Sequence, residues 1–165
     1  VSYNMIHYVF DLDDTLIIHQ KGVRIKYNEI KKDETLINLL DNCRAECYIY
    51  TNGTFGHAHS VIRKMNIKKF FFKVYSRDTL PYMKPDMRSF IAVKNDINRF
   101  YPDGGSVFFF DDLLENLKEA KSQGWITFWI NPDFLSSHQY DYVDYAFRNI
   151  KEALIYLEKQ NNSIF

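Results

Sequence analysis

The chain has 165 residues, of which 46% are hydrophobic, so it is long enough to bury one substantial core and we expect a single domain over residues 1–165. Its 21 Lys and Arg residues balance its 21 Asp and Glu residues, so the net charge gives no reason to expect bulk affinity for nucleic acid. Two cysteines are too few for a disulfide scaffold, and no apolar run has the length of a membrane span. We therefore expect a cytoplasmic globular protein without a membrane partner.

Short apolar runs alternate along the chain with segments of helical periodicity. The runs predict strands at Ile6–Phe10, Cys47–Tyr50, Lys73–Tyr75, Val107–Phe110 and Ile126–Ile130. The periodic segments predict helices over residues 36–40, 58–65, 87–97, 113–120 and 150–157. This alternation predicts an α/β fold, a Rossmann-like three-layer sandwich with a central parallel sheet of about five strands.

One segment interrupts the alternation. Residues 23–27 alternate strictly between apolar and polar side chains, and Lys21 and Gly22 supply a turn before them. This pattern predicts a small β-hairpin over about residues 16–27, placed as a flap directly after the first strand. An ordinary hairpin at the edge of the sheet is the alternative.

Asp11 and Asp13 follow the first predicted strand. In an extended segment, residues i and i+2 project to the same side, so the two carboxylates would share one site. Like charges that close repel each other unless a cation or a raised pKa intervenes. Magnesium is the natural cation for carboxylate oxygens and often bridges to a phosphate. An exposed turn rich in Asp is the simpler alternative.

Polar residues also follow other predicted strands, and the carboxyl ends of parallel strands meet at one edge of a sheet. Thr51 and Asn52 come between a strand and a helix, which suits an anion, although such residues also form ordinary turns. Lys84 precedes a helix that starts with proline. Asp111 and Asp112 form a second acid pair, which could also cap a helix. Their joint order, more than any one residue, indicates a phosphate site.

This order resembles the four motifs of the haloacid dehalogenase-like (HAD) hydrolase superfamily. The resemblance runs from Phe10 to about Leu157 and comprises Asp-x-Asp-x-Thr, a strand ending in Thr-Asn, Lys-Pro, and a strand ending in Asp-Asp. The local likeness is closest to the pyrimidine 5'-nucleotidase-like branch. It consists of Tyr50-Thr51-Asn52-Gly53 followed by His57-Ala58, Lys84-Pro85-Asp86, and Asp111-Asp112 followed by Asn116.

The resemblance implies a magnesium-dependent phosphatase with an aspartyl-phosphate intermediate. Asp11 would be the nucleophile and Asp13 the general acid and base. The implied phosphate ligands are Thr51, Asn52 and Lys84. The implied Mg²⁺ ligands are Asp11, Asp111 and the main-chain carbonyl of Asp13. Two residues would have supporting roles: Asp112 would reach the metal through water or anchor Lys84, and Thr15 would orient Asp13.

The second acid, Asp13, favours phosphoester hydrolysis, because a halide leaves without a proton. Many members of the superfamily carry a cap domain, but residues 14–46 and 51–84 leave no room for one, so we expect a capless phosphatase. An open site suits a macromolecular phosphate, either a phosphoprotein or a nucleic-acid end. A homodimer could instead close the site around a 5'-nucleotide or another small molecule. His57 and His59 lie near the second motif, and their role stays open.

Two functions of other classes remain possible from the residues. A receiver-like phospho-switch also combines aspartate, threonine, lysine and magnesium, but its acid pair comes first and its phosphoacceptor lies centrally. Here an acid pair precedes Thr51 and another follows Lys84, which does not fit that order. The other candidate is an inactive binding scaffold, against which stands the presence of every expected functional residue type.

Overall fold

Six parallel strands form one sheet in the computed structural model, which describes residues 5–163 of the chain. The strands are β1 (Ile6–Phe10), β2 (Glu46–Tyr50), β3 (Phe71–Tyr75), β4 (Ser106–Asp111), β5 (Ile126–Ile130) and β6 (Tyr145–Phe147), in the order β3-β2-β1-β4-β5-β6. All five predicted strands are confirmed. The sixth escapes prediction because it has only three residues and lies, partly exposed, at the edge of the sheet.

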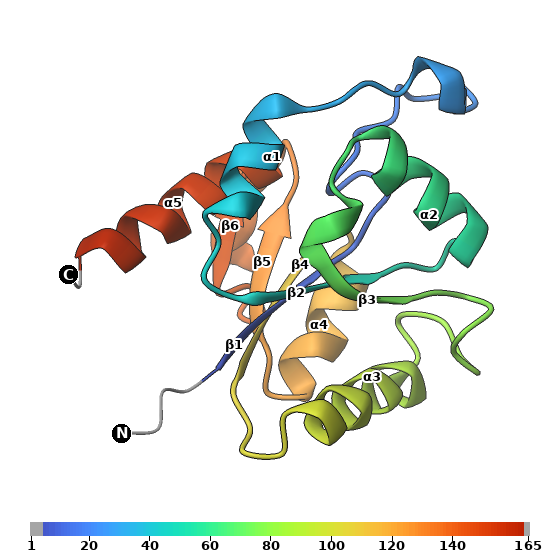
Figure 1. The fold of residues 1–165 in the computed structure, drawn as a ribbon. Helices are drawn as coiled ribbons and strands as arrows, with labels where there is room; N and C mark the ends of the chain where they lie inside the picture. Colours follow the sequence, from blue (N-terminus) through green and yellow to red (C-terminus); the bar gives the residue numbers. More distant parts are fainter. Residues whose placement is uncertain (1–4, 164–165) are drawn as a thin grey trace.

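Five helices connect and cover the strands. They are α1 (Glu34–Asp41), α2 (Phe55–Lys64), α3 (Met87–Phe100), α4 (Leu114–Ser122) and α5 (Ile150–Ser163), counted over the described residues. Asp33, Thr54 and Asp86 cap the first three helices by accepting a backbone N–H at each N-terminus. Figure 1 shows α1 and α5 together on one side of the sheet and α3 and α4 on the other. The predicted three-layer α/β architecture is therefore confirmed.

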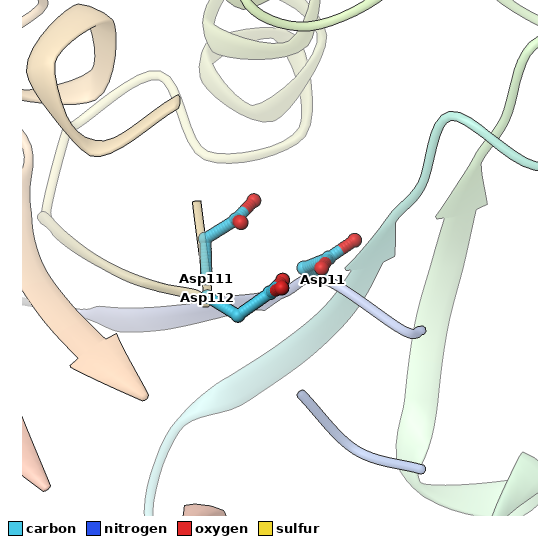
Figure 2. Close-up of side chains that lie close together, drawn as sticks. All are labelled: Asp11, Asp111 and Asp112. Carbon is cyan, nitrogen blue, oxygen red and sulfur yellow. The ribbon is translucent and has the colours of Figure 1, made fainter. Parts of the chain in front are cut away.

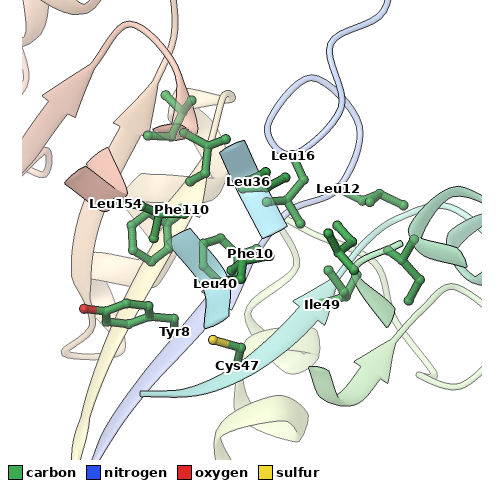
Figure 3. Close-up of a cluster of buried hydrophobic side chains, with 14 of the residues drawn as sticks. Tyr8, Phe10, Leu12, Leu16, Leu36, Leu40, Cys47, Ile49, Phe110 and Leu154 are labelled. Carbon is green, nitrogen blue, oxygen red and sulfur yellow. The ribbon is translucent and has the colours of Figure 1, made fainter. Parts of the chain in front are cut away.

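The core is divided by the sheet into two apolar layers, because successive residues of a strand point to opposite faces. On one face, Tyr8 and Phe10 of β1 pack with residues of α1, α2 and α5 (Figure 3). On the other face, Val9 packs with residues of α3 and α4. Both faces of the central strands are buried, which explains why their sequences read as continuous apolar runs.

The strand order places the candidate site. The chain leaves β1 toward β2 and β3 and then returns to the other side of β1 to form β4. The carboxyl ends of β1 and β4 therefore lie side by side where the winding direction reverses, which is where doubly wound sheets bind ligands. Asp11 directly follows β1, and Asp111 ends β4.

The predicted β-hairpin over residues 16–27 is wrong. The turn at Lys21 and Gly22 is present, but the residues on either side of it form no strands, and a short 3-10 helix, η1, spans Tyr27–Glu29. A two-stranded ribbon is barely stable without a third strand or a packed face, and Ile18 and Val23 are exposed. The segment is instead a loop over the carboxyl edge of the sheet.

The connections after β1 and after β2 are short. Among residues 5–163, the span 11–33 contains only η1, and the span 51–86 contains α2, a 3-10 helix η2 (Lys68–Phe70) and β3. The described residues therefore form no separate cap domain. No helix among them has the length and apolarity needed to cross a membrane.

Candidate active site

Three aspartates meet where β1 and β4 end. Asp11, Asp111 and Asp112 each offer a carboxylate oxygen, and these oxygens all lie within 4.8 Å of one another (Figure 2). Asp111 is completely buried and Asp11 is nearly so. Among the described residues, this is the one group of acidic, histidine or cysteine side chains arranged to hold a metal ion. The structure thus brings Asp11 and Asp111 together, as the sequence predicts.

Lys84 enters this cluster from the loop before α3. Its ammonium group lies 3.1 Å from Asp11 Oδ1 and 2.9 Å from Asp111 Oδ2, and it donates to the carbonyl of Tyr50 at 2.8 Å. The side chain of Lys84 is 1% exposed, so the ion pairs form away from water. These two carboxylates raise the pKa of Lys84, outweighing the opposing effect of burial, so the residue is a permanent cation.

Asn52 holds Lys84 in place. The Asn52 side-chain amide donates to the Lys84 carbonyl at 2.9 Å and accepts from the Lys84 backbone N–H at 2.8 Å. This reciprocal pair ties the loop after β2 to the loop before α3. Phosphate binding by Asn52 stays a prediction, whereas its contact with Lys84 is a role that the sequence does not reveal.

The cluster carries more negative charge than Lys84 can balance. Burial and the nearby charge of Asp111 raise the pKa of Asp11, although Lys84 opposes the rise. Burial, a hydrogen bond with Asp11 and the charge of Asp111 raise the pKa of Asp112. Without a further cation, the site therefore tends to retain a proton.

Thr15 and Asn116 complete the surroundings of the aspartates. The Thr15 hydroxyl lies 3.2 Å from Asp11 Oδ2 and 3.4 Å from Asp112 Oδ1. We expected this hydroxyl to orient Asp13, and the structure corrects that expectation. Asn116 is buried and donates to Asp111 Oδ2 at 3.1 Å. Both residues orient acids of the cluster.

The residues of the cluster fit a magnesium ion. Carboxylate oxygens are its preferred protein ligands, and Asp11, Asp111 and Asp112 offer three of them within reach of one another. Their excess negative charge also favours a cation beyond Lys84, which would replace the retained proton. The Asp13 side chain lies outside this group, so its main-chain carbonyl remains the atom that the resemblance assigns to the metal.

Asp13 is held by two histidines. His19 Nε2 lies 2.6 Å from Asp13 Oδ1, and His57 Nε2 lies 2.9 Å from the same oxygen. The Tyr27 hydroxyl lies 2.6 Å from the other ring nitrogen of His57. The sequence leaves the role of His57 open. The only signal for His19 is that a polar residue ends an apolar run.

Thr51 lies in the turn between β2 and α2. Its backbone N–H pairs with Tyr75, and its hydroxyl oxygen accepts the Gly53 N–H at 3.0 Å, so the hydroxyl keeps its own proton to donate. Thr51 is buried at the same edge of the sheet as Lys84 and Asp11. Its position agrees with the predicted phosphate contact, which stays a prediction.

The sequence matches no protein-family model and no curated protein. Solved structures do match the fold. One, described as the HAD-hydrolase YfnB from Bacillus subtilis bound to magnesium, has a TM-score of 0.59 and 25% sequence identity over 74% of this chain. The L-2-haloacid dehalogenase from Xanthobacter autotrophicus has a TM-score of 0.60 and 14% identity over 79%. This fold is that of the HAD-like hydrolases. A further HAD-superfamily hydrolase, from Ehrlichia chaffeensis, has a TM-score of 0.57 and 18% identity over 80%.

This chain spans only part of the length of these proteins. It covers 52% of the Bacillus protein, 62% of the Xanthobacter dehalogenase and 64% of the Ehrlichia hydrolase. The likeness therefore concerns the catalytic fold shared by the superfamily.

Proposed function

We propose that this protein is a magnesium-dependent phosphomonoester hydrolase that acts through an aspartyl-phosphate intermediate. The observation that carries the proposal is that two acids of one short turn lie in different surroundings. Asp11 lies in the buried cluster with Lys84, whereas Asp13 points to two histidines and its side chain is 34% exposed. One acid is placed to attack, and the other is accessible to a leaving group and to water.

The reaction follows from these positions. A carboxylate oxygen of Asp11 attacks phosphorus, the bond from phosphorus to the ester oxygen breaks, and the leaving oxygen takes the proton of Asp13. Asp13 then takes a proton from a water molecule as that water attacks phosphorus. The bond between Asp11 and phosphorus breaks, which releases inorganic phosphate and restores both carboxyl groups.

Positive charge must accompany this chemistry because a carboxylate and a phosphate dianion repel each other. Lys84 contacts Asp11 directly and would also face the phosphate bound there. A Mg²⁺ held by Asp11, Asp111 and Asp112 would supply further charge neutralisation. That a solved relative of this fold is described as bound to magnesium supports this choice of cation. Thr51 would donate its hydroxyl proton to the phosphate.

Dehalogenation is the competing reaction, since a haloacid dehalogenase shares the fold. Carbon-halogen cleavage needs the nucleophile but no acid for the departing halide. The polar contacts of Asp13 with His19 and His57 would have no use in that reaction. They support a substrate whose leaving oxygen needs a proton.

The surroundings of the site favour a macromolecular, polyanionic substrate. Residues 20–32, which we name the basic segment, carry five exposed cations and the single acid Glu29, in a chain whose net charge is zero. The cations are Lys21, Arg24, Lys26, Lys31 and Lys32. This segment borders the site, because His19 precedes it and Tyr27 within it contacts His57. A nucleic-acid end carries the repeated negative charge that such a segment attracts.

A cleft beside the site supports the same choice. Its volume is about 600 Å³, and it extends from Thr15 to Lys31 and Lys32. A third lysine in the cleft, Lys151, is paired with Asp33, whereas Lys31 and Lys32 form no ion pair with any described residue. Phosphates next to the scissile one could therefore reach free cations.

The proposed activity is tested with 4-nitrophenyl phosphate. The purified chain should release phosphate only when Mg²⁺ is present, and Asp11→Asn should reduce the rate by at least about 10³-fold, as expected when a nucleophile is lost. Asp96→Asn is the matched control, because Asp96 is another buried carboxylate and lies away from the cluster. Full activity of Asp11→Asn would refute the proposal. An aspartyl phosphate that persists would indicate a switch.

The substrate class is tested with a panel of 3'- and 5'-phosphorylated oligonucleotides, phosphopeptides, mononucleotides and sugar phosphates. We expect oligonucleotide ends to have the highest kcat/KM and the steepest loss with added salt, because binding releases counterions. Preference for a phosphopeptide or for one mononucleotide would overturn this choice of substrate, while leaving the phosphatase activity in place.

A further inference from the structure

The Asp13 carboxyl group is clamped at one oxygen. His19 Nε2 at 2.6 Å and His57 Nε2 at 2.9 Å both meet Asp13 Oδ1, and His57 Nε2 lies 3.1 Å from Oδ2. An ionised carboxylate has no proton to donate, so each imidazole donates its Nε2–H. Oδ2 is thus the less occupied oxygen of Asp13 and the one free to carry a proton.

His57 is fixed in the orientation that this contact requires. A neutral imidazole that donates from Nε2 has a lone pair on Nδ1, and the Tyr27 hydroxyl lies 2.6 Å from that atom, within reach to donate to it. The His57 backbone N–H donates to the Thr54 hydroxyl that caps α2. A Tyr27 hydroxyl that donates to Nδ1 stabilises this ring tautomer, and the helix start fixes the backbone.

His19 is fixed by the turn after Asp13. Asp14 has a left-handed backbone, with φ of 62°, which an aspartate tolerates better than most residues. Its carboxylate accepts the His19 backbone N–H at 3.0 Å, and its own N–H pairs with the Ile17 carbonyl at 2.7 Å. The turn thereby brings His19 back onto Asp13.

Gly53 leaves the space for this arrangement. A Cβ at this position would lie 3.1 Å from His57 Cδ2 and 3.7 Å from Asp13 Oδ2. A side chain here would press on the His57 ring next to its contact with Asp13. The lack of a side chain at Gly53 is thus part of the same arrangement.

We infer that His19 and His57 are positioning residues that hold Asp13 by Oδ1, so that Oδ2 delivers its proton to the leaving oxygen, with Tyr27 keeping His57 in the donating tautomer. The inference rests on the proposed phosphatase function. An Asp side chain on a half-exposed turn would otherwise rotate among several rotamers, of which few point its acid at the substrate. Two donors at one oxygen restrict that rotation.

The choice of leaving group distinguishes a positioning role of His19 and His57 from a purely structural one. Phenol is a poor leaving group that needs the proton of Asp13, whereas 2,4-dinitrophenol leaves without one. The value of kcat/KM covers formation of the aspartyl phosphate and departure of the phenol. Loss of acid positioning therefore slows phenyl phosphate selectively, whereas general damage to the fold slows both esters.

The experiment measures kcat/KM of the full chain with Mg²⁺ for both esters. His19→Ala and His57→Ala should each lower the value for phenyl phosphate by about 10- to 100-fold and the value for the dinitrophenyl ester by less than about threefold, as for partial loss of general acid catalysis. Asp13→Asn should show the same selectivity with a larger loss. His57→Gln should recover most of the activity, because its amide N–H₂ can donate from near the Nε2 position.

Two kinds of result would count against the inference and have different meanings. An equal loss on both esters, or no loss on either, overturns the inference while the wild type remains a phosphatase. An inactive wild type overturns the proposed function and the inference together. His59→Ala is the matched control on α2. Among the described residues, the His59 ring packs at a tilt against Phe55 and forms no hydrogen bond with Asp13, so this variant should change neither value. Tyr27→Phe removes one hydroxyl, and a selective loss with an unchanged Tm supports the inference if an alanine variant folds poorly.

Discussion

Two buried acidic sites of this protein have opposite balances of charge. Asp96, on α3, accepts from Lys73 and Tyr75 of β3 and pairs with Arg99, so one carboxylate has three donors. At the carboxyl ends of β1 and β4, the three carboxylates of Asp11, Asp111 and Asp112 share one ammonium group, that of Lys84. The first arrangement is complete and the second needs a cation.

We take this difference to distinguish a structural acid, Asp96, from the proposed functional site. A carboxylate whose partners are all present stabilises the fold and has no capacity left for a ligand. A cluster with excess negative charge is costly until a metal or another cation binds, which is how functional sites differ from ion pairs within the fold. The contrast can be tested by substituting the same residue types in both acidic sites, the one around Asp96 and the one around Asp11, Asp111 and Asp112.

The largest difference is expected for the two lysines. Lys84→Met leaves Asp11 and Asp111 buried without their cation, which should lower the free energy of unfolding by about 3–5 kcal/mol. Lys73→Met should cost about 1 kcal/mol or less, because the Lys73 side chain is 40% exposed and Asp96 keeps two other donors. Urea unfolding of both variants in chelator measures the two values. Equal losses would contradict the contrast.

The second largest difference is expected in how Mg²⁺ changes the free energy of unfolding. At a hundredfold excess over its Kd, Mg²⁺ should raise the free energy of unfolding of the wild type by about 2.7 kcal/mol, since it binds the folded state alone. Asp111→Asn should remove most of this gain, and Asp96→Asn should retain it. Thermal unfolding with and without chelator gives the measurement. A gain that survives in Asp111→Asn would place the cation elsewhere.

Asp96→Asn should cost about 1–3 kcal/mol at neutral pH, the penalty for a hydrogen-bond network left with a mismatched partner. Burial alone would raise the pKa of Asp96, but the hydrogen bonds from Lys73 and Tyr75 outweigh it and the pKa is lowered from 3.8. The folded state then binds fewer protons than the unfolded state. The contribution of ionised Asp96 to the free energy of unfolding is therefore complete above pH 3.8, and it is lost as the pH falls through the lower pKa of the folded state.

The acid cluster should show the opposite pH dependence. The pKa values of Asp11 and Asp112 are raised from 3.8, so the metal-free folded state retains protons that the unfolded state releases. Its stability should therefore fall as the pH rises above that value. The free energy of unfolding can be measured with urea at a series of pH values in chelator. Compared with the wild type, Asp112→Asn should lose less stability as the pH rises, and Asp96→Asn should lose less stability as the pH falls into the acid range. If the two variants behaved alike, the proposed difference in charge balance would be wrong.

Much of the fold was predictable because its central strands are buried on both faces and its helices show one apolar stripe. The errors occurred where the outcome depends on distant partners. Alternation over residues 23–27 satisfies the local condition for a strand, but no neighbouring strand pairs with it in the structure. β6 forms against β5 with only three residues, too few for a local pattern.

The part of the site formed by residues at the ends of neighbouring parallel strands was predictable. Asp11 and Asp111 meet because β1 and β4 are neighbours, and Lys84 reaches both of them. The partners of Asp13 could not be predicted in this way. His57 is 44 residues from Asp13 on another element, and His19 reaches Asp13 only because the chain turns back at Asp14.

The smallest effect is expected for Arg99→Ala. The Arg99 side chain is 76% exposed and pairs with Asp96 three residues before it on the same helix. Solvent screens such a pair, so the free energy of unfolding should fall by less than about 1 kcal/mol, and the difference should shrink in 1 M salt. Urea unfolding at low and high salt measures it, with Lys73→Met as the comparison. A loss as large as that of Lys84→Met would mean that Asp96 depends on Arg99 as strongly as Asp11 and Asp111 depend on Lys84, which would contradict the contrast between the two sites.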